Sequence, residues 1–168
     1  NISLTHPYFH DGKAAALAEL ATAGFDVPEF FVIPAAGFTQ GKSGPIPAKG
    51  LAAALKEALA GIAPGPFAVR SSGRGEDGAD HSHAGQFDTL LDIPARSVAR
   101  AAAQVWASGF AETVATYRAL TTGDPPEPPA IIVQRMARAR AAGVAFSADP
   151  LTGDRERAVI SAVAGLGD

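Results

Sequence analysis

Apolar residues recur at helical spacing in several stretches of the chain. Residues 12–23 carry alanine and leucine along one stripe, residues 51–59 form a shorter alanine-rich stretch, and residues 97–120 carry the longest stripe. This spacing predicts helices whose apolar faces pack against a core. The longest stripe includes Trp106 and Tyr117. These aromatic rings could stack on a nucleic-acid base, but at helical spacing we assign them to the core.

The first predicted helix has recognisable ends. Asp11 suits the N-cap position and Gly24 suits the position just past the last turn. Lys13 then falls in the first turn, where backbone N–H groups are free and the helix dipole is positive. A cation there is unfavourable unless an anion lies in front of it. The plain alternative is a solvated lysine on a polar face.

Short apolar runs predict buried strands between the helices. They are residues 30–33, 66–69, 130–136, 143–147 and 158–163, and alternation over residues 87–92 adds a strand that returns from the polar loop after residue 69. Residues 39–50 are rich in Gly, Pro and Lys and are predicted to form a loop, and residues 122–129 a connector. Consecutive strands of this kind favour an α+β fold with mixed or antiparallel sheets over an alternating βαβ array.

Composition narrows the classes of function. The 47% hydrophobic and 18% charged content is that of a globular chain. The net charge of -3 argues against broad nucleic-acid binding, which needs a basic surface. No cysteine is present, which excludes disulfides and thiolate metal sites, and no apolar run is long enough to span a membrane. We therefore expect a cytoplasmic protein that binds neither nucleic acid nor membrane.

Both ends of the sequence suggest a longer polypeptide. The chain begins at Asn1 rather than at Met, without the regions of a signal peptide. It stops at Asp168, shortly after a predicted strand and within a Gly-rich turn, which normally leads to further structure. We expect a fragment whose fold is incomplete at the C-terminus.

The most distinctive chemistry follows the strand at residues 66–69. Small residues there can bring backbone N–H groups close to a ligand. They are Ser71, Ser72, Gly73 and Gly75. Arg70 and Arg74 add forked guanidinium groups that suit phosphate. The pattern is typical of a polyphosphate cradle. On local chemistry alone, an ordinary polar surface turn explains the same residues equally well.

Two histidines lie in the same polar segment. His81 and His83 flank Ser82 and could hold a metal or carry a phosphoryl group. Without a third ligand nearby, such a pair is weak evidence for zinc. We interpret them as loop residues near the phosphates, and we assign no metal ligand in this chain.

Several segments, taken in order, resemble the N-terminal nucleotide-binding domain of phosphoenolpyruvate synthase and pyruvate phosphate dikinase. This domain is shared with rifampicin phosphotransferases and has the ATP-grasp fold. The segments are Asp11 to Leu20 with Val27 and Pro28, Ala68 to Ser72 with Glu76 and Asp77, Ser82 to Gln86 with Thr89, Trp106 to Ser108 with Tyr117 and Arg118, Val133 to Met136, Gly143 to Pro150, and Gly165 to Asp168. The resemblance implies a first ATP-grasp subdomain over residues 1–129. It implies the linker strand and the truncated start of a second subdomain over residues 130–168.

The resemblance also implies roles for single residues. Lys13 and Arg70 match the lysine and arginine that contact the nucleotide phosphates, and we expect them to support catalysis as positioning cations. Gly85 and Thr89 match positions that line the phosphate side. The roles of these four residues are predictions that follow from their matched positions in the family pattern.

The adenine end of the implied site falls on the linker strand. Gln134 and Met136 match the linker between the halves of the ATP-grasp fold. There, the backbone hydrogen-bonds the adenine edge and an apolar side chain packs on the ring. Both residues are therefore candidate nucleotide ligands.

The implied activity is ATP-dependent phosphoryl transfer. ATP bound here would pass phosphoryl groups to a histidine on another domain and then to pyruvate or a similar acceptor. The ligands of Mg²⁺, the phosphohistidine domain and the acceptor-binding domain are expected beyond residue 168, so this portion alone is expected to be inactive. The sequence does not distinguish pyruvate from an antibiotic or a glucan as acceptor.

An alternative function follows from departures from the family pattern. Asp11 stands where the family usually has glycine, His83 where it commonly has phenylalanine, and Asp168 where it usually has glutamate. Asp11 and Asp168 favour, as the alternative, a degenerate ATP-grasp module that binds nucleotide or a partner without turnover.

Overall fold

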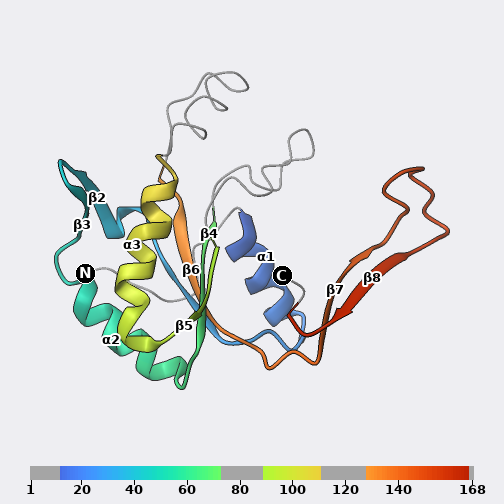
Figure 1. The fold of residues 1–168 in the computed structure, drawn as a ribbon, viewed down its shortest axis with the longest axis horizontal. Coiled ribbons are helices and arrows are strands. Elements are labelled where there is room, and N and C mark those ends of the chain that lie inside the picture. The colour runs from blue at the N-terminus through green and yellow to red at the C-terminus, as the bar shows by residue number, and fades with distance from the viewer. Residues whose placement is uncertain (1–11, 73–88, 111–127, 167–168) are drawn as a thin grey trace. The chain divides into compact units, whose positions relative to one another are not determined.

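The computed structural model describes residues 12–72, 89–110 and 128–166, and the chain forms two compact units, Asn1–Met136 and Ala137–Asp168. The helices and strands of the first unit are α1 (Gly12–Thr22), β1 (Phe30–Ile33), β2 (Phe38–Gly41), β3 (Gly44–Pro47), α2 (Leu51–Ile62), β4 (Phe67–Ser72), β5 (Thr89–Ile93), α3 (Val98–Ser108) and β6 (Ala130–Arg135) (Figure 1). Those of the second unit are β7 (Ala141–Phe146) and β8 (Val159–Ala164).

A four-stranded sheet organises the first unit. Its order is β1-β6-β4-β5, and each neighbouring pair is antiparallel. The continuous apolar runs that predicted β1 and β6 are buried over all four residues of β1 and over Ile131, Ile132 and Val133 of β6. The predicted α+β class with antiparallel sheets is confirmed.

The two faces of this sheet meet different partners, because successive side chains of a strand point to opposite sides. We call one side the core face, where strand residues are buried together with α2 and α3: Phe31, Ile33, Phe67, Val69, Ile131 and Val133. We call the other side the α1 face, where Phe30, Val32 and Ile132 pack with Ala14 of α1. Figure 1 shows α2 and α3 on one side of the strands and α1 on the other.

Helix α3 confirms the predicted core role of Trp106. The ring is 2% exposed, its Nε1–H donates to the carbonyl of Ala35 at 3.0 Å, and its centroid lies 5.8 Å from that of Phe38. Of the helix predicted over residues 97–120, α3 covers Val98–Ser108, and the part from residue 111 lies outside the described residues. The Gly109 N–H bonds back to the Trp106 carbonyl just past the end of α3. Tyr117 lies outside the described residues.

The end of α1 follows the predicted glycine signal. Gly24 has φ +85, and its N–H bonds to the carbonyl of Ala21 while the Phe25 N–H bonds to that of Leu20. This pair of bonds is the Schellman pattern, which needs a residue in the left-handed conformation. Gly24 therefore ends the helix as expected. The predicted N-cap, Asp11, lies outside the described residues.

The prediction of a loop over residues 39–50 is wrong for most of that range. Strands β2 and β3 pair there as a two-stranded antiparallel hairpin, with Thr39 opposite Ile46. Pro45 and Pro47 favoured a loop because they lack an N–H donor. A two-stranded ribbon tolerates them, since each strand pairs along one edge alone.

One strand boundary also differs from the sequence prediction. The strand predicted to end at residue 69 continues to Ser72, so Arg70 and Ser71 lie within β4. The compact units divide after Met136, because β6 pairs with both β1 and β4. The assignment of residues 1–129 and 130–168 to ATP-grasp subdomains stays a prediction.

The second unit is an antiparallel hairpin. Gly143 of β7 lies opposite Ala162 of β8, and a Cβ atom at Gly143 would meet the Ser161 carbonyl oxygen at 2.2 Å. The close approach of these strands therefore requires glycine. No helix among the described residues has the length and apolar character needed to cross a membrane.

Candidate functional site

Arg70 lies near the middle of the sheet on its α1 face. It stands in β4 opposite Thr89 of β5 and Ile132 of β6. Its Nη2 group donates to Oε1 of Gln134 at 3.2 Å, and Nε2 of Gln134 donates to the Pro28 carbonyl at 3.1 Å. The second bond fixes which end of the amide faces the arginine. Gln134 thus orients the guanidinium group without adding a charge of its own.

The start of α1 meets the end of the same strand. The Ala14 N–H, in the first turn of α1, donates to Oγ of Ser72 at 3.2 Å, and this contact is buried. Ser72 follows Arg70 by two positions, so both side chains lie on the α1 face. Lys13 is therefore part of a helix start that is attached to β4 close to Arg70. The positive end of the helix dipole lies there too.

The structure brings most of the predicted phosphate-side residues to one face. Arg70 and Thr89 are direct cross-strand neighbours, and Lys13 joins them through the contact between α1 and β4. Cross-strand neighbours share a face of the sheet. Gly85, the remaining predicted residue on the phosphate side, lies outside the described residues, as do His81 and His83.

Met136 lies at the opposite end of β4 from Ser72. Its N–H donates to the Pro66 carbonyl at 3.0 Å, and its Sδ accepts the N–H of Asp92 at 3.1 Å. The six residues of β4 span about 20 Å. Met136, predicted for the adenine side, and Ser72 thus lie at opposite ends of one strand, whereas Gln134, also predicted for the adenine side, contacts Arg70 directly.

Two backbone N–H groups of the linker, those of Arg135 and Met136, already donate hydrogen bonds within the protein. The Arg135 N–H donates to the Glu29 carbonyl at 2.9 Å, and the two side chains form an ion pair. Together with the Met136 N–H, two of the donors closest to Gln134 are therefore used by the fold. Adenine recognition by Gln134 and Met136 stays a prediction.

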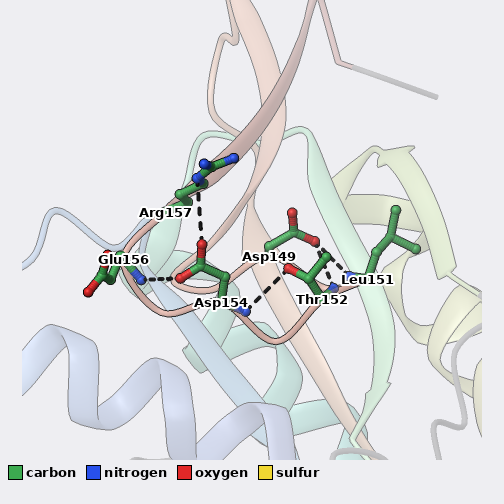
Figure 2. Close-up of polar contacts among 6 residues, drawn as sticks. All are labelled: Asp149, Leu151, Thr152, Asp154, Glu156 and Arg157. Atoms are coloured by element: carbon green, nitrogen blue, oxygen red, sulfur yellow. Dashed lines mark hydrogen bonds and ion pairs between the residues drawn. The ribbon is translucent and has the colours of Figure 1, made fainter.

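A second polar cluster lies in the hairpin between β7 and β8 (Figure 2). Oδ1 of Asp149 accepts the N–H groups of Leu151 and Thr152 at 2.8 and 3.1 Å. Asp154 accepts the Glu156 N–H at 2.9 Å and lies 3.5 Å from Arg157 Nε. The N–H groups of Leu151 and Thr152 hold the pKa of Asp149 below its ordinary 3.8. The cluster thus stabilises the turn.

The described residues give no support for a metal site. No group of three or more His, Cys, Asp or Glu side chains comes together among residues 12–72, 89–110 and 128–166. These residues alone do not fit a bound Mg²⁺, which needs several oxygen ligands around one point. That its ligands lie beyond residue 168 stays a prediction.

Sequence reasoning missed the role of Ser72. The sequence placed it in a polar loop, whereas it is the last residue of β4 and contacts α1. The sequence signal that could have located Ser72 is the alternation of side chains along a strand. If the strand is extended past residue 69, Arg70 and Ser72 lie on the same face of the sheet. The contact with Ala14 itself joins residues 58 positions apart and leaves no local signal.

Comparison with known proteins adds an independent finding. Residues 42–168 match the family model described as pyruvate phosphate dikinase, AMP/ATP-binding domain. The match includes Arg70, Thr89, Gln134 and Met136, whereas Lys13 precedes it.

Curated relatives match over much of the chain. The prodigiosin synthesizing transferase PigC of Serratia marcescens is 37% identical over 186 residues, which covers 96% of this chain and 21% of that protein. A rifampicin phosphotransferase of Streptomyces sp is 42% identical over 104 residues, covering 61% of this chain and 12% of that protein. A probable phosphoenolpyruvate synthase of Staphylothermus marinus is 40% identical over 104 residues, with 60% and 12% covered. The chain therefore spans about a fifth or less of the length of these relatives.

Proposed function

This chain belongs to the pyruvate phosphate dikinase AMP/ATP-binding domain family, and we propose that it binds ATP with the phosphates on the α1 face of the four-stranded sheet. Its antiparallel sheets and packed helices form the ATP-grasp-like fold of this family. The observation that carries the proposal is the convergence of Arg70 and the start of α1 on one face.

The chemistry of this face suits a polyphosphate. A guanidinium group matches phosphate oxygens through paired donors, and Arg70 is already oriented by Gln134. The N-terminus of α1 adds backbone N–H groups and the positive end of its dipole. Lys13 supplies a second cation at this position. A bound phosphate chain carries negative charge that both cations can offset.

The relatives support a nucleotide role rather than an acceptor role for this segment. Their names point to different products or acceptors, including prodigiosin, rifampicin and phosphoenolpyruvate. A segment that such proteins share is best explained by the chemistry common to them, and the family description names AMP and ATP. We therefore assign acceptor choice to other parts of the polypeptide.

In the complete protein, we propose phosphoryl transfer from this site to a histidine on another domain. A histidine nitrogen forms a bond to phosphorus as a phosphoanhydride bond of ATP breaks, and the nucleotide leaves with the bonding electrons. Arg70 and Lys13 hold the phosphates and offset the charge on the oxygens, and Mg²⁺, when bound, offsets more of it. The phosphohistidine then passes the group to pyruvate or a similar acceptor.

Titration of the full natural protein with Mg·ATP tests the phosphate assignment. We expect Arg70→Ala and Lys13→Ala each to weaken binding about tenfold or more, because each removes a charge-assisted contact. Arg100→Ala and Lys56→Ala are matched controls, since these exposed residues lie on α3 and α2 across the core face. Unchanged affinity in both Arg70→Ala and Lys13→Ala would rule out the proposed site.

A further inference from the structure

We propose that Ser72 is a positioning residue that holds Lys13 at the phosphate site; this inference rests on the proposed function. Ser72 bonds to the Ala14 N–H, which belongs to the peptide group that joins Lys13 to Ala14. The hydroxyl therefore fixes the backbone directly beside the cation. The sequence pattern placed Ser72 in a candidate phosphate cradle through its backbone, and it assigned no role to the Ser72 hydroxyl.

The hydrogen bond between Ala14 and Ser72 is buried in the protein interior. Ala14 is 1% exposed and Ser72 is 7% exposed, and their Oγ to N distance is 3.2 Å. A buried N–H group must find an acceptor, because leaving it without one is costly. Replacing the hydroxyl would therefore force the first turn of α1 to move or to admit water.

Ser72, the last residue of β4, acts like a helix cap for α1. The first N–H groups of a helix have no partner within the helix and commonly bond to a nearby side-chain oxygen. The first turn of α1 carries no acidic residue, and Gly12 enters the helix with φ +77. The acceptor from β4 thus ties the position of the helix start to the strand that carries Arg70.

This attachment matters because of the charges it brings together. Lys13 lies in the first turn of α1 and Arg70 lies in β4, so the Ser72 bond links the elements that carry the two cations. The bond holds the start of α1 in place before ATP arrives. Binding then costs less ordering, which is the general advantage of a preorganised site.

The adjacent serine provides a matched control. Ser71 is 2% exposed, belongs to the same strand and points to the opposite side of the sheet, the side of Val69. Ser71→Ala therefore removes a buried hydroxyl next to Ser72 without touching the contact to α1. Ser72→Thr keeps the hydroxyl and serves as the conservative variant.

A double-mutant cycle in the full natural protein tests the inference. We expect Ser72→Ala to weaken Mg·ATP binding about fivefold to tenfold, Ser72→Thr to retain most of the affinity, and Ser71→Ala to leave it unchanged. In the Lys13→Ala background, Ser72→Ala should add little, because the residue that it positions is gone. Calorimetric titration measures affinity, and thermal unfolding measures stability separately.

Two results would overturn the inference in different ways. If Ser72→Ala weakens binding by the same factor with and without Lys13, Ser72 acts on the fold and not through Lys13. If Lys13→Ala weakens binding and Ser72→Ala does not, the helix start needs no attachment from Ser72. Unchanged affinity in Lys13→Ala and Arg70→Ala would overturn the proposed function itself, and the positioning role with it.

Discussion

Neighbouring residues of one strand lie on opposite faces of the four-stranded sheet and differ in their environment and in their expected role. Val69 is 0% exposed among apolar side chains of α2, α3 and the strands, whereas the next residue, Arg70, faces the other way and bonds to Gln134. The same contrast occurs on β6 between Val133 and Gln134. Alternation along a strand thus lets one sheet carry the larger apolar core on one side, and a smaller apolar cluster together with polar residues on the other.

The largest expected effect is on the core face. Phe67→Ala should lower the free energy of unfolding by about 3–5 kcal/mol, because it removes a fully buried ring and leaves a cavity. Urea unfolding measures this loss. The fraction that stays folded should bind Mg·ATP with unchanged affinity. A large loss of affinity at an unchanged unfolding midpoint would contradict the division between the faces.

A smaller effect on Mg·ATP affinity is expected on β6, where the adjacent residues Val133 and Gln134 lie on opposite faces of the sheet. Gln134→Leu removes the acceptor of Arg70 and the donor to Pro28, so we expect about fivefold weaker Mg·ATP binding from a loss of about 1 kcal/mol. Val133→Ala, one residue away on the core face, should reduce stability and leave affinity unchanged. Titration with Mg·ATP and urea unfolding of both variants would show whether Gln134→Leu mainly reduces affinity and Val133→Ala mainly reduces stability. Equal losses of affinity in the two variants would refute this difference between the faces.

The smallest effect should arise in the hairpin of the second unit. Because backbone N–H bonds lower the pKa of Asp149, its carboxylate stabilises the turn at pH values above the ordinary 3.8. That contribution is lost as the pH falls through the lower pKa of the folded state. Amide NMR signals of Leu151 and Thr152 should therefore stay constant from about pH 5 to pH 8 and shift only in stronger acid. Asp149→Ala should abolish the acid shift; its persistence would assign the titration to another group.

The sequence predicted the parts of the fold whose signals are local. Continuous apolar runs located β1 and β6, and the glycine after α1 marked the end of that helix. The hairpin of β2 and β3 was missed because Pro45 and Pro47 outweighed the pairing that tertiary structure provides.

The sequence named candidate site residues but not the hydrogen bonds between them. Arg70 and Lys13 were proposed from charge, position and the family resemblance. The bonds that organise them, from Gln134 to Pro28 and from Ala14 to Ser72, join residues 106 and 58 positions apart. Such contacts follow from strand order and helix placement, which no local pattern encodes.

A structure of the full natural protein with Mg²⁺ and a non-hydrolysable ATP analogue would test the central claim most directly. The measured quantity is the distance from the phosphate oxygens to the guanidinium group of Arg70 and to Nζ of Lys13. We expect hydrogen-bond distances of about 2.7–3.2 Å, with the phosphates on the α1 face. Phosphates bound away from this face, out of contact with both cations, would contradict the account.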